Sequence, residues 1–209
     1  PRGAFAFWEP IIRRMAGLGQ VDLHASHDYH DKAYGFSDVA VVGGGPAGIS
    51  AALEAAKAGA EVILIEDGRR LGGSLNSCRY EADQAAARNL RQELVAAVEA
   101  SPNIIVLTDA VCQGLFADNW LPVTKGTRLH KIRATSVIVA TGAAEQHIVF
   151  RNNDLPGIMM GSAAQRLIRL YGVRPGKRAV VATDDGNGYG VALDLSENGV
   201  EVAAIVDLR

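Results

Sequence analysis

The sequence predicts an α/β fold with a parallel sheet, and three observations support it. Short apolar runs recur along the chain, the stretches between them carry apolar side chains at helical spacing, and a cluster of glycines directly follows the first run. Continuous apolar runs are typical of strands that a parallel sheet buries on both faces. The runs lie at residues 39–42, 61–65, 104–107, 136–140, 179–182 and 202–206.

The glycine cluster predicts a dinucleotide-binding turn. Gly43, Gly45 and Gly48 have the spacing G-x-G-x-x-G. In such a turn the first glycine permits the tight bend, the second lets a pyrophosphate approach the backbone, and the third lets the helix pack closely on the strand. Pro46 and Ala47 fall in the first helical turn, where a proline costs no hydrogen bond and free N–H groups face the phosphates.

An acidic residue stands where this kind of turn places a ribose. Glu66 ends the second run, about 20 residues after Gly48. Its carboxylate would accept hydrogen bonds from ribose hydroxyls and repel a 2′-phosphate, which favours NAD or FAD over NADP. Asp67 follows it and joins the predicted site, while Arg69 and Arg70 soften the exclusion of phosphate. Together these features predict a Rossmann-like FAD/NAD(P)-binding domain, against the alternative of a glycine turn that binds nothing.

Residues 1–37 are predicted to form a helix and a linker ahead of that domain. One helical face carries Trp8, Ile11, Ile12 and Met15. This helix would end near Gly17 or Gly19 and either dock on the main domain or contact missing chain or a partner subunit. From residue 21 to 37 we expect a solvated linker. Its histidines, His24, His27 and His30, have a spacing that suggests metal ligands, but no helix signal holds them and no cysteine joins them.

The glycine pair after the ribose-binding strand has two interpretations. Gly72 and Gly73 either let the backbone approach a bound cofactor, which makes Gly73 a candidate binding residue, or form a plain turn. A helix is expected next, over residues 84–99, and a third parallel strand over 104–107. The inward face of that helix is predicted to carry Ala87, Leu90, Leu94 and Val98.

Residues 111–133 differ in pattern from the flanking helices and strands, because short apolar runs alternate there with turn residues. This pattern predicts a β-meander insertion. Its solvated face is predicted to carry Arg128, His130, Lys131 and Arg133. The strand at 136–140 follows and ends in Thr141 and Gly142. A small residue and a glycine at a strand's carboxyl end suit the place where a cofactor crosses the sheet, so both are candidate binding residues.

The chain then starts a second unit of the same type. A helix is expected over residues 161–171, with Ala164, Leu167, Ile168 and Tyr171 on one face. The pattern at 199–202 repeats that at 59–62, and this register places Thr183, Asp185 and Gly188 where the first unit has Gly43, Gly45 and Gly48. A carboxylate at position 185 would repel phosphate. We therefore predict a degenerate, truncated Rossmann-type βαβ unit that has lost dinucleotide binding.

Bulk composition narrows the function classes. The chain has 209 residues, a net charge of −2 and no long basic run, which argues against nucleic acid or an anionic membrane as partner. No apolar stretch is long enough to span a bilayer. Cys78 and Cys112 form no C-x-x-C pair, which argues against disulfide reductase chemistry and indicates reduced thiols in a cytoplasmic protein. No residue is a convincing catalytic acid, base, nucleophile or metal ligand.

The expected organisation has three parts. Residues 1–37 form the helix and linker, 38–150 the dinucleotide-binding domain, and 151–209 the partial second unit. The chain starts at Pro1 and ends just after a strand-like run. A parallel sheet would leave that last strand uncovered, so we expect a fragment of a longer protein.

Three stretches resemble one family. Residues 7–19, residues 140–145 with 149–157, and residues 171–176 are similar to segments of the alpha subunit of heterotetrameric sarcosine oxidases, within the flavoproteins that have two dinucleotide-binding domains. The resemblance covers essentially the whole chain. Gln146 and His147 stand where that family leads us to expect Arg-Pro. The family's amino-terminal ferredoxin-like domain and carboxyl-terminal folate-binding domain are not in the sequence.

The resemblance implies an oxidoreductase subunit acting on a CH–NH donor. In that family the alpha subunit holds NAD, and a flavin-bearing beta subunit oxidises the N-methyl amine. Carried over by motif, Gly43, Gly45, Gly48 and Glu66 would bind the dinucleotide, and Thr141 and Gly142 would line its far side. The other subunits of the heterotetramer would be the partners, and this fragment alone would be inactive. Two alternatives stay open: FAD in the same turn, as in related amine or opine dehydrogenases, or a non-catalytic nucleotide-binding scaffold for assembly.

Overall fold

The computed structural model describes residues 2–17, 22, 24–25, 29–79 and 84–209, in two compact units, Pro1–His30 and Asp31–Arg209. The segment Pro1–His30 contains α1 (Arg2–Met15), which confirms the predicted helix and begins six residues before Trp8. Its apolar face is exposed, and whether it docks stays a prediction. His27 lies outside the described residues. Among those that are described, no three acidic, histidine or cysteine side chains gather as a metal site would require.

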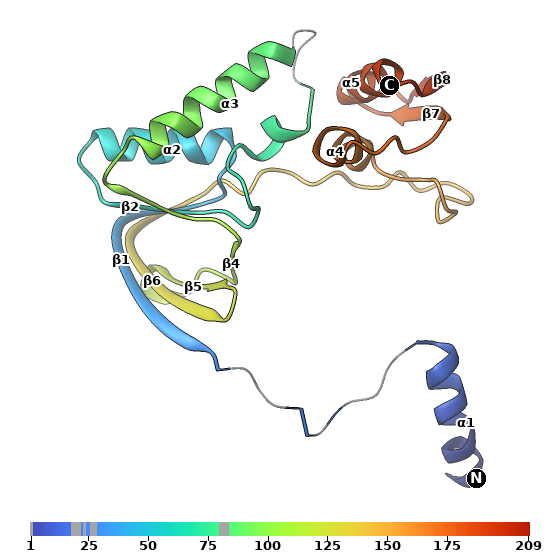
Figure 1. Cartoon of the computed structure of the whole chain (residues 1–209), viewed down its shortest axis with the longest axis horizontal. Helices are drawn as coiled ribbons and strands as arrows, with labels where there is room; N and C mark the ends of the chain where they lie inside the picture. The colour runs from blue at the N-terminus through green and yellow to red at the C-terminus, as the bar shows by residue number, and fades with distance from the viewer. Residues whose placement is uncertain (1, 18–21, 23, 26–28, 80–83) are drawn as a thin grey trace. The chain divides into compact units, whose positions relative to one another are not determined.

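A six-stranded sheet organises the part of the chain from Asp31 onward, in the order β3-β2-β1-β6-β5-β4 (Figure 1). Its first four strands are parallel, and β5 and β4 continue it antiparallel. The predicted parallel sheet and β-meander are therefore parts of one sheet. The strands are β1 (Asp31–Val42), β2 (Val62–Ile65), β3 (Ile104–Leu107), β4 (Ala110–Cys112), β5 (Trp120–Lys125) and β6 (Arg128–Val139).

Two expectations about strand limits were wrong. Residues 31–37 are the first half of β1 and not a linker, so the predicted domain boundary at residue 38 falls inside a strand. The last strand of the meander and the run at 136–140 are one strand, β6. Both strands are longer than predicted because they pair with each other. β1 and β6 run in parallel from Asp31 with Arg128 to Val42 with Val139, and each supplies the other's hydrogen bonds. In the outer half of β1 the side chains alternate between half-buried and exposed, so no continuous apolar run marks it as a strand.

The two faces of the sheet are covered in different ways. Helices α2 (Pro46–Lys57) and α3 (Gln84–Glu99) lie on one face, as Figure 1 shows, with Ile49, Ala52 and Val98 buried against the parallel strands. The sheet curls, so that its own meander strands cover the other face of the parallel part. Leu121 of β5 and Ile132 of β6 pack there with Ile63 and Ile65 of β2. Of the predicted inward residues of α3, Leu94 and Val98 pack in the core, whereas Leu90 is exposed.

The predicted solvated face of the meander is only partly solvated. Arg128 and Arg133 are exposed and pair with acidic side chains, but His130 and Lys131 are half-buried. Burial, together with the nearby positive charges, lowers the pKa of His130. Lys131 places its Nζ 5.4 Å from the centre of the Tyr34 ring on β1. Because β1 runs beside this part of β6, the surface combines exposed and half-buried side chains.

The second βαβ unit, predicted over residues 151–209, has its helices and strands from residue 161 onward. Its elements are α4 (Gly161–Tyr171), β7 (Arg178–Thr183), α5 (Asn187–Glu197) and β8 (Glu201–Asp207), and β7 and β8 pair in parallel as a separate two-stranded sheet. On α4 the predicted inward Tyr171 is exposed, and Gln165 is buried instead. A polar partner on α5, described below, accounts for that exchange. No helix in the described ranges is long and apolar enough to cross a membrane.

Candidate dinucleotide-binding site

The first glycine of the motif is required by backbone shape and by space. Gly43 leaves β1 with a φ of 109°, a conformation that side chains disfavour. A Cβ there would lie 2.2 Å from the carbonyl oxygen of Ala140, at the end of β6. Its N–H donates to the carbonyl oxygen of Ile65 at 2.8 Å. Gly43 therefore sits where the ends of β1, β2 and β6 meet.

Gly48 and Gly45 differ in what surrounds them. A Cβ on Gly48 would lie 1.8 Å from the carbonyl oxygen of Gly43, so the third glycine lets α2 pack on the turn. A Cβ on Gly45 would meet only the Cα of Gly73, at 3.8 Å. The backbone at Gly45 is therefore open to a ligand, and its φ of −76° needs no glycine. This contrast agrees with packing for the third glycine and access for the second.

The start of α2 fits an anionic group. Gly45 is the N-cap residue and has no side chain to accept hydrogen bonds from the first turn. Pro46 occupies the first helical position and Ala47 is exposed beside it. The free N–H groups and the positive end of the helix dipole attract a phosphate group. The start of α2 therefore offers free N–H groups and a positive helix dipole to an anionic group at the turn.

Glu66 lies at the end of β2, as predicted, but it is 8% exposed and already hydrogen-bonded. Its Oε2 accepts the Gly44 N–H at 2.6 Å and its Oε1 accepts the Gly68 N–H at 2.8 Å. Burial raises the pKa of Glu66; the neighbouring Asp67 adds to the rise and the two N–H groups oppose it. Each oxygen keeps a second lone pair for a ribose hydroxyl. Asp67 is exposed beside the site.

Gly44 also contributes to the candidate site, although the motif does not count it. A Cβ there would lie 2.5 Å from Leu71 and 2.9 Å from the Glu66 carboxylate. Its N–H fixes Glu66, and its carbonyl oxygen accepts the Gly72 N–H at 2.8 Å. The uninterrupted triplet at positions 43–45 was the available signal, because the motif alone requires no glycine at its second position.

The glycine pair supports the turn from behind. Gly73 has a φ of 49°, and a Cβ on it would lie 2.7 Å from the Cα of Gly45. It begins the short 3₁₀ helix η1 (Gly73–Asn76), where the Asn76 side chain donates to the carbonyl oxygens of Leu71 and Gly73. Arg91 on α3 also donates to Leu71. The structure thus brings Gly73 into the site as a packing partner of Gly45.

Thr141 and Gly142 follow the end of β6 beside the turn. The Ala140 N–H donates to the carbonyl oxygen of Val42 at 2.8 Å, which holds this end against β1. Thr141 and Gly142 are exposed, and Gly142, with a φ of 76°, has open space around it. Both are accessible from the end of the sheet where Gly43 lies.

The equivalent turn of the second unit is closed by its own side chains. The Asp185 carboxylate accepts the Asn187 N–H at 2.9 Å and the Asn187 side-chain amide at 2.6 Å, at the first residue of α5. The Asn187 N–H is the first cause of the lowered pKa of Asp185. Gly188 keeps its packing role, because a Cβ there would lie 2.3 Å from Thr183. A carboxylate therefore occupies the place that a phosphate would take, which supports the predicted loss of binding.

Comparisons with known proteins agree with this geometry. Over residues 37–181 the chain matches the family described as "Pyridine nucleotide-disulphide oxidoreductase". Sarcosine oxidase subunit alpha of Rhizobium meliloti (strain 1021) is 37% identical over 219 residues, covering 97% of this chain. The same subunit of Corynebacterium sp. (strain P-1) is 35% identical over 211 residues, covering 93%. The predicted resemblance to these alpha subunits is confirmed.

A solved structure supports the fold class. L-Proline dehydrogenase from P. horikoshii superposes on 88% of this chain, and on 38% of its own, with a TM-score of 0.72 at 30% identity. Together with the family match, this confirms the predicted Rossmann-like FAD/NAD(P)-binding fold. The chain spans 22% of the length of the two curated relatives named above.

Proposed function

The chain belongs to the pyridine nucleotide-disulphide oxidoreductase family, and from that premise we propose that it is the dinucleotide-binding part of a sarcosine oxidase-like alpha subunit. It holds NAD beside a flavin-bearing partner subunit of a cytoplasmic heterotetramer that oxidises a CH–NH donor. Gly43, Gly45 and Gly48 receive the pyrophosphate, and Glu66 binds the adenosine ribose. Asp67, Thr141 and Gly142 line the same end of the sheet.

One observation supports this proposal above the others. The uncapped start of α2 lies beside the open backbone of Gly45, and the Glu66 carboxylate stands at the end of the adjacent strand. Those are the two contacts that the shared half of NAD and FAD requires, for its pyrophosphate and its adenosine ribose. The second unit has the same fold but fills the equivalent place with Asp185.

The protein's part in the chemistry is binding and orientation. NAD, when bound, supplies a nicotinamide ring that accepts or donates hydride. The turn fixes the phosphates, and Glu66 fixes the adenosine end. The groups described around the turn are backbone N–H groups and Glu66, whose oxygens are engaged with Gly44 and Gly68. On this proposal the amine is oxidised at the partner subunit, and this fragment alone has no oxidase activity.

FAD in the same turn is the second candidate. The residues of the turn contact only the pyrophosphate and adenosine, which NAD and FAD have in common, so both dinucleotides satisfy the same geometry. A third candidate is a non-catalytic scaffold, which the closed turn at Asp185 favours because one of the two βαβ units has a purely structural start to its helix.

The spectrum of the purified chain tests these candidates. The protein is denatured after its absorbance is recorded, and the released nucleotide is identified by mass. A colourless protein that releases or binds NAD supports the alpha-subunit function. A yellow protein that releases FAD rejects the NAD function and supports the second candidate. A chain that binds neither NAD nor FAD on titration overturns both candidates.

A further inference from the structure

One arginine joins the loop behind the glycine turn to the second unit. Arg79 lies three residues after η1, and its side chain is 7% exposed. Its two terminal nitrogens donate to the Glu197 carboxylate at 2.7 and 3.1 Å, and one of them lies 3.6 Å from Asp194. Both acids belong to α5, so a residue of the first unit ends on a helix of the second.

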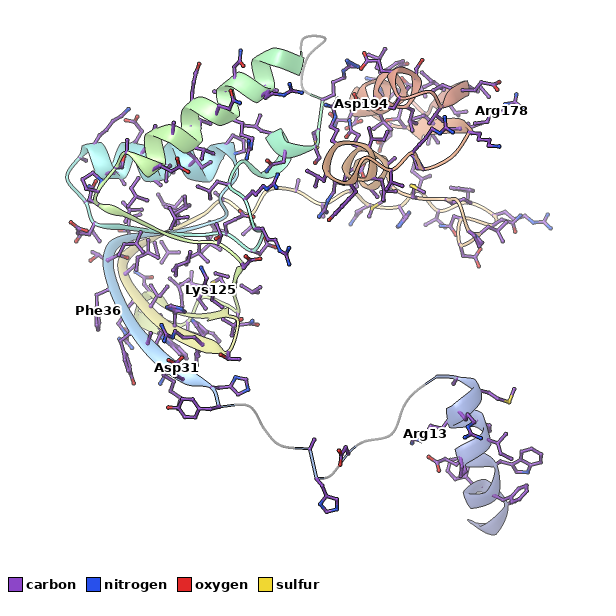
Figure 2. All side chains as sticks on the ribbon, viewed as in Figure 1. Arg13, Asp31, Phe36, Lys125, Arg178 and Asp194 are labelled. Carbon is purple, nitrogen blue, oxygen red and sulfur yellow. The ribbon has the colours of Figure 1, made fainter. Side chains whose placement is uncertain are left out.

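Asp194 is the centre of this cluster. It is fully buried, and it accepts the Gln165 side-chain amide at 2.7 Å and the Arg169 guanidinium at 2.5 Å, both from α4. This partner is why Gln165 is buried on α4. Figure 2 labels Asp194, which lies on α5. The carboxylate thus ties α4 to α5 and presents a negative charge to Arg79.

Gly190 gives Arg79 its place on α5. A Cβ on Gly190 would lie 3.5 Å from both the Cβ and the carbonyl oxygen of Arg79, and 3.9 Å from its Cδ. A larger side chain would therefore occupy the position of Arg79. Glycine within a helix otherwise costs about 1 kcal/mol relative to alanine. The binding turn does not explain a small residue at this position, but the close approach of Arg79 does.

The cluster is better suited to fixing an arrangement than to adding stability. Burying a guanidinium and a carboxylate carries a large desolvation penalty, which their attraction only partly offsets. Among the described residues, the Arg79 Nε is buried and has no hydrogen-bond partner, which adds to that cost. In some proteins a costly buried pair is kept because it fixes how the joined segments lie.

The segment that Arg79 holds is the one that supports the glycine turn. Within it, the Gly72 N–H is bonded to Gly44 and Gly73 lies against Gly45. Asn76 closes η1 between these contacts and Arg79. A shift of this segment moves the backbone that supports Gly44 and Gly45, and Gly44 in turn holds Glu66.

We propose that Arg79 is a positioning residue for the dinucleotide site, and that α5 of the second unit is its anchor. The inference rests on the proposed dinucleotide binding. It gives the second unit a role after the loss of its own binding turn. The anchored segment keeps the glycine turn and Glu66 in the arrangement that receives pyrophosphate and ribose.

A pair of substitutions at one position tests this without removing a charge. In the whole chain, Gly190→Leu places a side chain where Arg79 lies, whereas Gly190→Ala fits at an ordinary contact distance and also favours the helix. Arg79→Ala is the second disrupting variant. Arg178→Ala removes an arginine of the same unit whose ion pair with Glu201 is exposed, and it is the control. Dissociation constants for NAD and for FAD are measured by calorimetry, and backbone hydrogen exchange is measured over residues 71–79.

The expected result is selective. Gly190→Leu and Arg79→Ala weaken the affinity for the bound dinucleotide by about tenfold and speed exchange of the Gly72 N–H, while Gly190→Ala and Arg178→Ala do neither. Unchanged affinity and exchange in both disrupting variants overturn the inference and leave the proposed function intact. Lower thermal stability with unchanged affinity assigns Arg79 a purely structural role and also overturns it. A wild type that binds neither NAD nor FAD overturns the proposed function, while the exchange of Gly72 still reports whether Arg79 anchors the segment.

Discussion

Glu66 performs two tasks with one carboxylate. In the unliganded chain it joins two loops, through Gly44 on one side and Gly68 on the other. In the proposed complex its remaining lone pairs accept ribose hydroxyls. A buried carboxylate that the protein has partly satisfied is already oriented, so the ligand needs only to complete its hydrogen bonds.

The ionisation of Glu66 has a consequence for stability. Because burial raises its pKa above that of the unfolded chain, its contribution is complete below the ordinary Glu pKa and is lost as pH rises through the raised value. We expect the unfolding free energy of the wild type to fall relative to that of Glu66→Gln as pH rises from the ordinary Glu pKa through the raised value. Urea unfolding at a series of pH values measures this difference, with the exposed Glu54→Gln as control. Parallel curves for wild type and Glu66→Gln would contradict the prediction.

The second and third glycines of the motif separate binding from folding. Gly45→Ala has room for its methyl group, so we expect a folded chain whose dinucleotide affinity falls by about tenfold or more, because the methyl group meets the pyrophosphate. Gly48→Ala forces a methyl group into the Gly43 carbonyl and should cost at least about 1–3 kcal/mol of stability. Thermal unfolding and calorimetric titration measure the two effects. Gly186→Ala, in open space before α5, should change neither, and equal affinity in Gly45→Ala and wild type would refute the assignment.

Among the elements, those with a strong periodic pattern were predictable. The inner halves of β1 and β6, and also β2 and β3, are continuous apolar runs, and α2 buries Ile49 and Ala52, which lie at helical spacing. The outer half of β1 was not predictable, because small residues (Ala33, Gly35 and Ser37) fill half-buried positions and its hydrogen bonds come from β6, far along the chain. Likewise the buried Gln165 on α4 could not be read from periodicity, since its partner Asp194 lies on another helix.

The meander face of the sheet is a true core, and a pair of isoleucines tests this. Ile132 on β6 is 1% exposed, whereas Ile105 on β3 is 55% exposed. We expect Ile132→Ala to lower the unfolding free energy by about 2–5 kcal/mol, because it leaves a cavity. Ile105→Ala should change it by much less. Chemical denaturation measures both values, and similar losses at the two positions would show that the meander does not enclose a packed core.

Just before α5, the Asp185 carboxylate accepts a backbone N–H of the first helical turn. We expect Asp185→Ala to lower the thermal midpoint at neutral pH, because the first turn loses its acceptor. Hydrogen bonding lowers the pKa of Asp185, so this stabilisation is present above the ordinary Asp pKa and is lost as pH falls through the lowered value. Scanning calorimetry at neutral and acidic pH measures it. Asp184→Ala, at the exposed neighbouring position, is the control, and equal midpoints for the two variants would refute the capping role.

Across the whole molecule, the two βαβ units predict a single binding event. We expect one dinucleotide per chain, since the first turn is open and the second is closed by its own carboxylate. At a ligand concentration 100 times the dissociation constant, binding should stabilise the chain by about 2.7 kcal/mol. Calorimetric titration gives the stoichiometry, and thermal unfolding with and without ligand gives the stabilisation. Two equivalents bound, or binding that survives Gly45→Asp, would refute this division between the units.

The candidate site was predictable where the motif dictates it. The positions of Gly43, Gly48 and Glu66 follow from spacing, because a strand, a tight turn and a helix leave few other arrangements. What surrounds them was not predictable. Gly44 holds Glu66, and the segment ending at Arg79 supports the turn, through contacts that join distant parts of the chain. Single-sequence reasoning recognises local patterns, and these contacts have none.

The long pairing of β1 with β6 also constrains how the chain is made. The Asp31–Arg128 ion pair at one end of it joins residues 97 positions apart. Residues 38–42 of β1 have an earlier partner, in β2 and in Glu61 just before it, whereas residues 31–37 pair with β6. During synthesis the amino-terminal half of β1 is therefore an open strand edge until residues 128–134 have left the ribosome. Pairings over such separations form slowly, and an uncovered edge can join a neighbouring chain, so this half of β1 is open to edge-to-edge association until its partner emerges.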